Sequence, residues 1–399
     1  MGGIIALAVF CGDQPARKGT QVGAGTIFRC NLVRTVALAT ITLALIPSGA
    51  LAAAWRTEAT PSNPEGQTGA SFAGVSCPAA SSCVAVGTGS PDGPVLAESW
   101  DGTAWAYQPV PESGANPGLN SVSCVSATFC VAVGNTDGST GRGSIDMWNG
   151  SDWTGQPAAS GGPAGVSCTS GVFCVAVGGS RAEFWDGQRW RSQTVPHLNR
   201  TARLDAVSCT APTACTAVGT YSVSFPRPFG RSLPLVEHWN GQRWVGQHAP
   251  GGKMALSGLS DVSCVSRSFC VAVGNQNVTQ GVDFSAPPFV EIFHAGHWAI
   301  STAGIQTWTS LYGVSCVTAA SCTAVGRSVP GHEPNFLKVH PFIEGWNGSR
   351  WAVEPTPHVS RGSELQGVSC VLGIGCTAVG WDGEEGAGQP LVETAASTA

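Results

Sequence analysis

Two apolar runs separated by a short variable stretch recur along the chain. The motif reads Val-Ser-Cys, five variable residues, Cys, one residue and Ala-Val-Gly, and it is present seven times. Short runs rich in β-branched residues are typical of buried strands. We therefore expect each copy to form a hairpin of two strands. The first cysteines of successive copies lie between 41 and 55 residues apart.

A second motif, Trp, Asp or Asn, Gly, two residues and Trp, lies between the cysteine motifs. Asp-Gly and Asn-Gly supply the positive φ angles of a tight turn, so each aromatic pair is expected to bracket a turn between two further strands. Four short antiparallel strands in a repeat of this length predict one blade of a β-propeller. The copies are Trp100–Trp105, Trp148–Trp153, Trp185–Trp190, Trp239–Trp244 and Trp346–Trp351, with a degenerate copy at Phe293–Trp298.

The two ends of the repeat array complement each other. The last repeat has no tryptophan strand, whereas an isolated one begins at Trp55 and resembles the segment that begins at Trp351. We expect residues 55–60 to complete the repeat that begins near residue 367. The sequence thus predicts an all-β chain: a seven-bladed β-propeller with four antiparallel strands per blade, closed by the N-terminal Trp strand. An open solenoid would need distinct capping repeats, which the sequence does not display.

An export signal is predicted ahead of the array. Arg29 and Arg34 precede an apolar run at 36–46, and small residues follow at 48–54, which is the order of a signal peptide with its cleavage site. The alternative, a membrane anchor, would need roughly 20 apolar residues to span a bilayer. We assign residues 1–54 to a signal peptide and upstream extension and residues 55–399 to the propeller. We expect a secreted, extracellular monomer with no membrane span after signal cleavage.

The cysteines of each motif are predicted to form disulfides. Five intervening residues let the two cysteines face each other across a hairpin, and an exported chain reaches an oxidising compartment. The alternative is a metal site, but no histidine recurs beside the pairs, so neither a metal nor a cofactor is expected. The predicted pairs are Cys77–Cys83, Cys124–Cys130, Cys168–Cys174, Cys209–Cys215, Cys264–Cys270, Cys316–Cys322 and Cys370–Cys376.

Charge limits the range of partners. The formal net charge is −5, charged residues make up 11% of the chain, and no basic run is present. An acidic chain of this kind binds nucleic acid and anionic lipid poorly. We expect the partner to be a glycan, a cell-wall polymer or a protein.

An acidic residue recurs two positions before the first tryptophan, on one face of the strand. A ring of carboxylates is either a catalytic or metal array or a set of structural acceptors. Recurrence in every repeat favours the structural interpretation, because a catalytic site normally breaks symmetry. The same argument favours packing over a carbohydrate platform for the repeated tryptophans, and leaves Trp308 and Trp381 as platform candidates. The acidic residues are Glu98, Asp146, Glu183, Glu237, Glu291, Glu344 and Glu393.

Variable loops favour one face of the predicted ring. The cysteine loops and tryptophan turns share a face and are short, whereas the connections between second and third strands share the other face with the connections between repeats. Three of these connections, at 220–234, 275–288 and 327–341, are long and mix aromatic with charged residues, which suits a binding surface. The candidate binding residues are Tyr221, Phe225, Arg227, Phe229, Arg231, Asp283, Phe284, His332, Glu333, Phe336, Lys338 and His340.

The repeat resembles the kelch superfamily of propellers, since Ala-Val-Gly followed by Trp-Asp-Gly-x-x-Trp corresponds to the kelch Gly-Gly strand and its aromatic strand pair. The second glycine is mostly missing, and paired cysteines are not a kelch feature. The turn is also similar to a shortened Asp-box of sialidase-type propellers. As a whole the pattern is most similar to uncharacterised secreted repeat proteins of actinobacteria. These resemblances imply a fold and no activity.

The favoured function is a non-catalytic extracellular binding or scaffold propeller. The alternative is an extracellular hydrolase or lyase acting on carbohydrate, and a purely structural exported protein is a third option. Neither Gly-x-Ser-x-Gly nor His-Glu-x-x-His occurs, and no catalytic residues can be assigned. Three or more non-repeating charged residues at the mouth of the central channel would favour an enzyme, whereas a flat aromatic surface would favour a binder.

Overall fold

The computed structural model divides the chain into two units, Met1–Gly49 and Ala50–Ala399. The described residues all belong to the second unit, and the predicted signal peptide lies outside them apart from Ala54. They are residues 54–61, 69–89, 95–111, 118–135, 142–160, 162–196, 201–223, 231–251, 256–277, 288–301, 309–329, 339–357, 362–383 and 388–396.

The regular structure of these residues consists of β-strands, β1 to β28, so the predicted all-β class is confirmed. Among them we find no helix with the length and apolar character to cross a membrane. The strands form five four-stranded sheets and one eight-stranded sheet, in which two sets of four are joined by the single parallel pair of Ser232 with Leu256. We call each set of four consecutive strands a blade.

The strands of each blade follow one another in the chain, except in the last blade. Blade 1 is β2 (Ser71–Ala79), β3 (Ser82–Thr88), β4 (Val95–Trp100) and β5 (Trp105–Tyr107). Blade 2 is β6 (Gly118–Ser126), β7 (Phe129–Asn135), β8 (Arg142–Trp148) and β9 (Trp153–Ser160). Blade 3 is β10 (Gly165–Ser170), β11 (Phe173–Gly178), β12 (Arg181–Trp185) and β13 (Trp190–Thr194). Blade 4 is β14 (Ala202–Ala211), β15 (Ala214–Val223), β16 (Arg231–Trp239) and β17 (Trp244–Gln247).

The remaining strands complete the array. Blade 5 is β18 (Leu256–Ser266), β19 (Phe269–Asn277), β20 (Phe289–His294) and β21 (His297–Ser301). Blade 6 is β22 (Thr309–Thr318), β23 (Ser321–Ser328), β24 (His340–Trp346) and β25 (Trp351–Glu354). Blade 7 is β26 (Glu364–Val371), β27 (Gly375–Asp382) and β28 (Gln389–Ala396), with β1 (Arg56–Glu58) as its outer strand.

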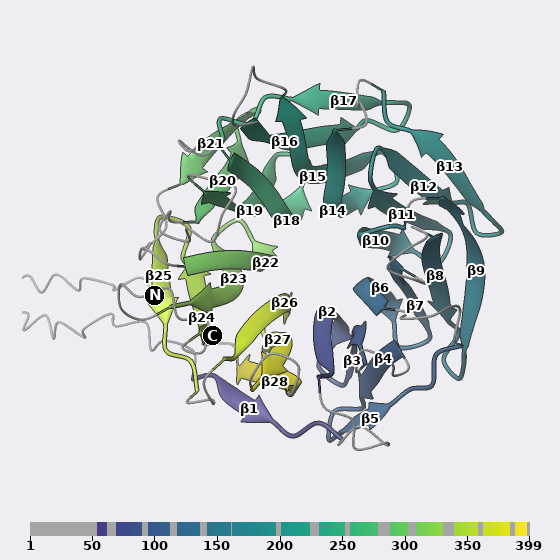
Figure 1. Ribbon diagram of the computed structural model, residues 1–399, viewed down its shortest axis with the longest axis vertical. Coiled ribbons are helices and arrows are strands. Elements are labelled where there is room, and N and C mark those ends of the chain that lie inside the picture. Colours follow the sequence, from purple (N-terminus) through teal and green to yellow (C-terminus); the bar gives the residue numbers. More distant parts are fainter. Residues whose placement is uncertain are drawn as a thin grey trace, which may run out of the picture. The chain divides into compact units, whose positions relative to one another are not determined.

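The blades surround a central opening (Figure 1), and the first strand of each blade lies against the first strand of the next. The same contact joins β26 of blade 7 to β2 of blade 1. In blade 7, Arg56 pairs with Thr394 and Glu58 with Val392, so the N-terminal strand adds to β28 as an antiparallel neighbour. The indole Nε1 of Trp55 donates a hydrogen bond of 2.7 Å to Glu354 in blade 6.

A serine links each blade to the next. In every copy of Val-Ser-Cys, the serine Oγ accepts a hydrogen bond from the backbone N–H of the equivalent first cysteine in the following blade, at 2.9–3.0 Å. The seventh of these bonds runs from Cys77 of blade 1 to Ser369 of blade 7. The motif therefore builds both a hairpin and the contact between neighbouring blades. The accepting serines are Ser76, Ser123, Ser167, Ser208, Ser263, Ser315 and Ser369.

The hairpin of each cysteine motif is bridged as predicted. All seven disulfides form between cysteines six positions apart, with Cα atoms 4.0 Å apart. Each bridge closes a short loop, for which the chain-entropy estimate is about 2 kcal/mol of stability. In six blades the two aromatic residues around the turn pair directly across the third and fourth strands, with ring centroids 5.4–5.8 Å apart. The apolar residues of Ala-Val-Gly are buried in the middle of each sheet.

Candidate functional site

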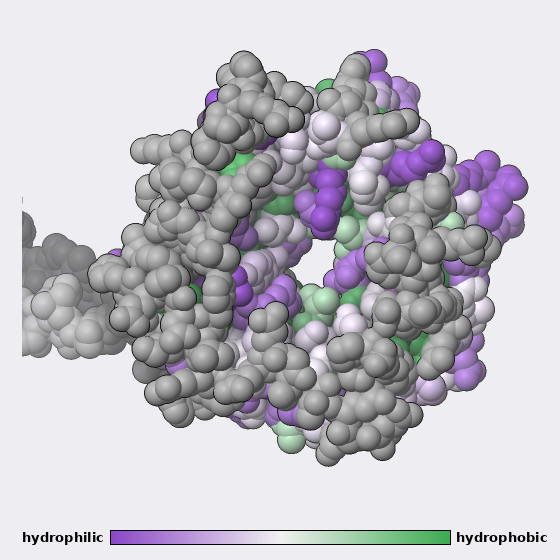
Figure 2. Space-filling view, in the orientation of Figure 1, coloured by the Kyte–Doolittle hydropathy of each residue, from purple (hydrophilic) through white to green (hydrophobic). Residues whose placement is uncertain are grey.

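Among the described residues, the central channel forms a cavity with a volume of about 990 Å³. Residues at or beside the first strand of every blade line it, and Figure 2 shows its opening with hydrophilic residues at the rim. Because this site uses all seven blades, it depends on the closed arrangement of the ring. Its residues lie toward the starts of the first strands, the end of each blade from which the variable connections also depart.

A β-bulge supplies the channel-lining residue in six of the blades. The pairing register between first and second strands shifts at one equivalent place, so one residue of the first strand is left without a partner. A buried Phe or Leu precedes this residue, and the Val-Ser-Cys motif begins two positions after it. The bulge residues that line the channel are Ala73, Asn120, Asp205, Ser260, Tyr312 and Gln366.

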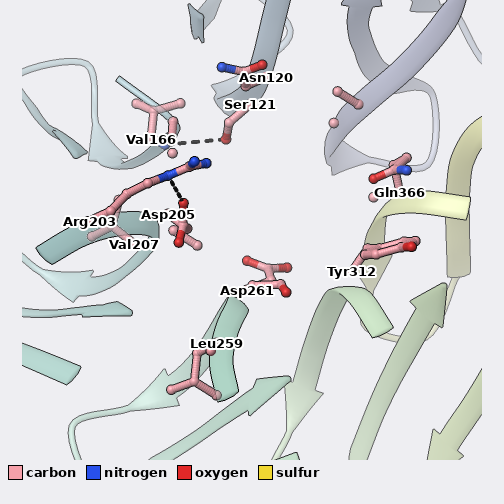
Figure 3. A pocket seen from close by; sticks show the side chains of 18 of the residues that line it. Asn120, Ser121, Val166, Arg203, Asp205, Val207, Leu259, Asp261, Tyr312 and Gln366 are labelled. Carbon is pink, nitrogen blue, oxygen red and sulfur yellow. Dashed lines mark hydrogen bonds and ion pairs between the residues drawn. The ribbon is translucent and has the colours of Figure 1, made fainter. Parts of the chain in front are cut away.

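Blades 4 to 7 concentrate the polar chemistry of the channel. Nε of Arg203 lies 2.5 Å from Oδ1 of Asp205, two residues further along β14 (Figure 3). The Arg203 side chain is 71% exposed and that of Asp205 is 20% exposed, so the cation projects into the opening while the carboxylate lies against the wall. Burial raises the pKa of Asp205, and the charge of Arg203 opposes the rise. Blades 1 and 3 contribute Ala73 and Ala164 at the corresponding positions.

Asp261 in blade 5 uses its carboxylate to hold the channel wall. Oδ1 accepts the N–H of Val262 and Oδ2 accepts the N–H of Val314 in blade 6, both at 2.8 Å. Ser121 occupies the equivalent position in blade 2, and its Oγ accepts the N–H of Val166 in blade 3 at 3.3 Å. Burial raises the pKa of Asp261 to about 7, although both backbone hydrogen bonds lower it. This carboxylate therefore joins two blades as well as facing the channel.

A second ion pair, between Arg327 and Glu364, lies next to Tyr312. Nη1 of Arg327 lies 3.0 Å from Oε2 of Glu364, and the Arg327 guanidinium carbon is 5.7 Å from the centre of the Tyr312 ring. The side chain of Gln366 donates to Glu364 Oε1. Burial and the negative charge of Glu364 raise the pKa of Tyr312 to about 12, so its hydroxyl stays protonated and available as a donor. Tyr312 and Gln366 thus face the channel opposite the Arg203–Asp205 pair (Figure 3).

The structure describes three of the predicted binding residues, and none of the three lines the channel. Tyr221 packs against the hydrophobic core of blades 3 and 4, while its neighbours Thr220 and Ser222 face the channel. Arg231 is exposed and pairs with Val223, and His340 pairs with Ser328. The other candidates lie outside the described residues: Phe225, Arg227, Phe229, Asp283, Phe284, His332, Glu333, Phe336 and Lys338.

Sequence reasoning missed Arg203, Asp205, Asp261 and Gln366. The signal was present: the positions just before Val-Ser-Cys change chemistry from repeat to repeat while the residues around them stay constant. Of the two platform candidates, Trp381 is half-buried on β27, opposite Glu364 and Pro390, and Trp308 lies outside the described residues.

The recurring acidic residues are buried in the third strand of each blade, away from the channel lining. Each pairs with the alanine of Ala-Val-Gly on the second strand. Glu291 Oε1 accepts the N–H of Gly251 at 2.8 Å, from the segment that leads into its blade. Burial raises the pKa of Glu237, Glu291 and Glu344 to about 7. It raises the pKa of Glu98 to about 8, and the pKa of Glu393 also rises to about 8, with a smaller contribution from Asp382.

No group of three or more histidine, cysteine or acidic residues in the described segments is placed to hold a metal ion. The polar groups of the channel are therefore amides, hydroxyls, one exposed guanidinium and carboxylates already held by neighbours. Such a set can donate and accept hydrogen bonds to a polar ligand from several directions.

Solved structures resemble this arrangement, although neither a protein-family model nor a curated protein sequence matches the chain. YCF48 from Cyanidioschyzon merolae superposes with a TM-score of 0.56 at 11% identity, covering 86% of this chain and 99% of that chain. The fold is that of a β-propeller. The RRP9 WD40 repeats give 0.57 at 8% identity, covering 87% and 99%.

An enzyme is among the neighbours of the propeller. The GH74 enzyme from Niastella koreensis gives a TM-score of 0.55 at 10% identity, covering 82% of this chain and 53% of that chain. At these identities the likeness concerns the fold alone. The predicted β-propeller fold is thus confirmed, whereas the kelch-specific likeness stays a prediction.

Proposed function

We propose that this protein is an extracellular, non-catalytic binding or scaffold propeller, and that it binds a glycan at the mouth of the central channel. The observation that carries the proposal is the break in symmetry at the bulge positions, where blades 4 to 7 present Asp205, Ser260, Tyr312 and Gln366, with Arg203 beside Asp205. Residues that serve the fold repeat in the blades, whereas these differ from blade to blade.

The chemistry of the channel favours a ligand rich in hydroxyl groups. A hydroxyl donates one hydrogen bond and accepts others, so it suits a wall that mixes amides, a guanidinium, carboxylates and a phenol. The volume of about 990 Å³ is at the upper end of the range for small-molecule sites, which allows more than one sugar ring to enter. Seven disulfides support an oxidising, extracellular setting.

Binding to an array of glycans and cell-wall polymers tests the proposal with the Arg203→Ala and Asp205→Asn variants. Loss of a charged hydrogen-bonding group should weaken binding about tenfold to a hundredfold. The matched control is Arg191→Ala, which removes an exposed arginine that also pairs with an aspartate, Asp186, but on the outside of blade 3. Equal affinity of the Arg203→Ala and Arg191→Ala proteins for every bound glycan would contradict the proposal, as would binding of proteins only.

Carbohydrate hydrolysis is the second candidate function, and the same cluster favours it. Arg203, Asp205 and Asp261 are three non-repeating charged residues in the channel, and burial raises the pKa of both carboxyl groups. A carboxyl group with a raised pKa can act as a general acid. Release of reducing ends from polysaccharide distinguishes the two candidates: a hydrolase should lose about a hundredfold or more of its rate in Asp205→Asn while it still binds substrate.

A further inference from the structure

The boundary between blades is built around the aromatic pair of the following blade. At three boundaries the residue just before the first aromatic position of one blade packs onto that pair in the next. The Phe184 ring lies 4.7 Å from Trp239 and 6.3 Å from Trp244, between ring centroids. Met147 belongs to the hydrophobic cluster that includes the aromatic pair of blade 3, and Ile292 belongs to the cluster that includes the aromatic pair of blade 6. An apolar side chain therefore fills the space in front of these tryptophans.

The other four boundaries have Ser99, His238, Gly345 or Thr394 at this position, and we consider the one between blades 7 and 1 because a cavity lies there. Thr394 stands at the equivalent position of blade 7, because Ala395 pairs with Cys376 as Trp185 pairs with Cys174 in blade 3. A cavity of about 320 Å³, which we call the seam pocket, lies here between Thr394 and Thr377 on one side and Trp100 and Trp105 on the other. Its volume is at the lower end of the range for small-molecule sites.

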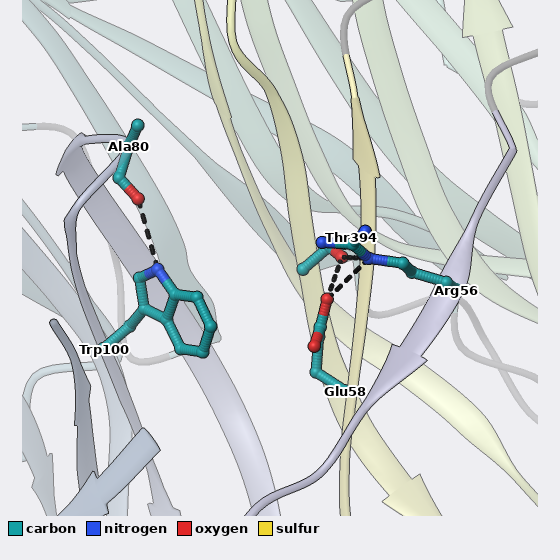
Figure 4. A network of polar contacts seen from close by, with 5 residues as sticks. All are labelled: Arg56, Glu58, Ala80, Trp100 and Thr394. Atoms are coloured by element: carbon teal, nitrogen blue, oxygen red, sulfur yellow. Dashed lines mark hydrogen bonds and ion pairs between the residues drawn. The ribbon is translucent and has the colours of Figure 1, made fainter. Parts of the chain in front are cut away.

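One wall of the seam pocket is polar. Nε of Arg56 donates to Glu58 Oε1 at 2.7 Å and to Thr394 Oγ1 at 3.2 Å, and Thr394 Oγ1 donates to the same glutamate oxygen at 2.7 Å. Figure 4 shows this network on blade 7 and Trp100 on blade 1. The Trp100 indole is only partly buried and donates to Ala80 O at 3.2 Å. The pocket therefore offers an aromatic surface beside carboxylate and hydroxyl oxygens.

Exposed apolar residues lie at the rim. The cysteine loop of blade 7 carries Leu372, which is 68% exposed, and Ile374, which is 43% exposed and lines the pocket. Large exposed apolar side chains beside a cavity are typical of a surface that binds another polypeptide. This rim is on the face of the cysteine loops, at the opposite ends of the strands from Arg203 and Asp205.

We propose that the seam pocket binds a tyrosine side chain of a partner protein, whose ring takes the place that Phe184 holds at the boundary of blades 3 and 4. The tyrosine ring packs against Trp100, as Phe184 packs against Trp239. Its hydroxyl forms a hydrogen bond with the Arg56–Glu58–Thr394 network. A phenylalanine side chain has no hydroxyl group and could not form this bond. Leu372 and Ile374 contact the polypeptide around the tyrosine. A free phenol lacks this polypeptide and would not contact Leu372 and Ile374.

Calorimetric titration of the full chain tests the proposal with three probes: acetyl-Gly-Tyr-Gly-amide, the same peptide with alanine in place of tyrosine, and p-cresol. The tyrosine peptide should bind at least about tenfold more tightly than the alanine peptide and more tightly than p-cresol. Thr394→Phe should abolish binding, because the new ring fills the pocket from within. Ile374→Asp should weaken binding about tenfold or more by placing a charge at the apolar rim.

Val172→Asp is the matched control, because Val172 holds the same position in the cysteine loop of blade 3 and is 66% exposed there. This variant should bind the tyrosine peptide like the unaltered chain. The Ile374→Asp variant keeps the test decisive if Thr394→Phe does not fold. The proposal is overturned if the tyrosine and alanine peptides bind alike, if p-cresol binds as tightly as the peptide, or if Ile374→Asp and Val172→Asp have equal affinity.

Discussion

The serine of Val-Ser-Cys has one contact that recurs at every boundary between blades. Its hydroxyl accepts the N–H of the next blade's first cysteine, for example Ser208 from Cys264 at 3.0 Å. The two cysteines of the motif link the strands of one hairpin. The serine before the first cysteine links that hairpin to the hairpin of the next blade. The sequence shows that this serine recurs. It does not show which group the serine contacts, because the partner is a backbone N–H more than 40 positions away.

Replacing Ser208 by alanine should lower the free energy of unfolding by about 1–3 kcal/mol, because the N–H of Cys264 is then left partly buried without its acceptor. Urea denaturation followed by tryptophan fluorescence measures the change. Ser81→Ala, in the exposed cysteine loop of blade 1, serves as the control and should change stability by less than about 0.5 kcal/mol. Equal stability of the two variants would argue against a structural role for the serine contact.

At the scale of the strand, the bulge in the first strand explains the glycine of Ala-Val-Gly. The bulge brings a carbonyl oxygen of the first strand against this glycine, so that a Cβ on Gly219 would lie 2.0 Å from Arg203 O. The corresponding distance is 1.9–2.2 Å in the other five blades with this bulge, and 2.5 Å in blade 3, where the paired strands have no bulge at this place. The bulge thus requires a glycine on the second strand, and it directs an adjacent residue of the first strand toward the channel.

Gly219→Ala should destabilise the propeller by about 3 kcal/mol, since backbone rather than a flexible side chain must move to admit the methyl group. The midpoint of thermal unfolding, read by circular dichroism, is the measurement. Gly246→Ala on the outer strand of the same blade is the control, because its Cβ would come no closer than 3.4 Å, to Glu237 Oε1. If the Gly219→Ala protein is as stable as this control, β14 and β15 can move apart to admit the methyl group without loss of stability, and the prediction is wrong.

The repeat allows the strands to be predicted from sequence, but the channel could not be predicted in the same way. Paired tryptophans around Asp-Gly or Asn-Gly place the ends of β16 and β17 at Trp239 and Trp244, and facing cysteines set the register of the hairpins. A bulge adds one residue without changing the apolar pattern, so that pattern does not show that Asp205 faces the channel. The sign in the sequence is that this position changes its chemistry from repeat to repeat. Tyr221 was selected for its loop, yet alternation along β15 directs its ring into the core.

At the scale of the whole molecule, buried acidic residues make stability depend on pH. The pKa of a glutamate is ordinarily 4.5, and burial raises it to about 7 for Glu237, Glu291 and Glu344. Between these values the folded chain keeps protons that the unfolded chain releases, so rising pH favours unfolding. Below pH 4.5 both states are protonated and this difference disappears.

The melting temperature should therefore fall as the pH rises from 5 to 8.5, by roughly 2–4 °C for each kcal/mol of stability lost. Differential scanning calorimetry over this range measures the slope. Glu344→Gln should flatten the slope, because the amide keeps the shape of the protonated acid and cannot lose a proton, while the exposed Asp152→Asn should leave it unchanged. A melting temperature that rises toward pH 8.5 would contradict the assignment of protonated glutamates to the folded state.

The pairing of β1 with β28 gives the ring an order of assembly. A ribosome delivers β1 before every other strand of the array and β28 after all of them, although the two are hydrogen-bonded neighbours in one sheet. Six blades can be completed from contiguous chain as synthesis proceeds, whereas the seventh needs both the earliest and the latest segments. The edge of β28 can thus be covered only after synthesis has passed residue 394, so the two ends cannot join before the whole array has been made.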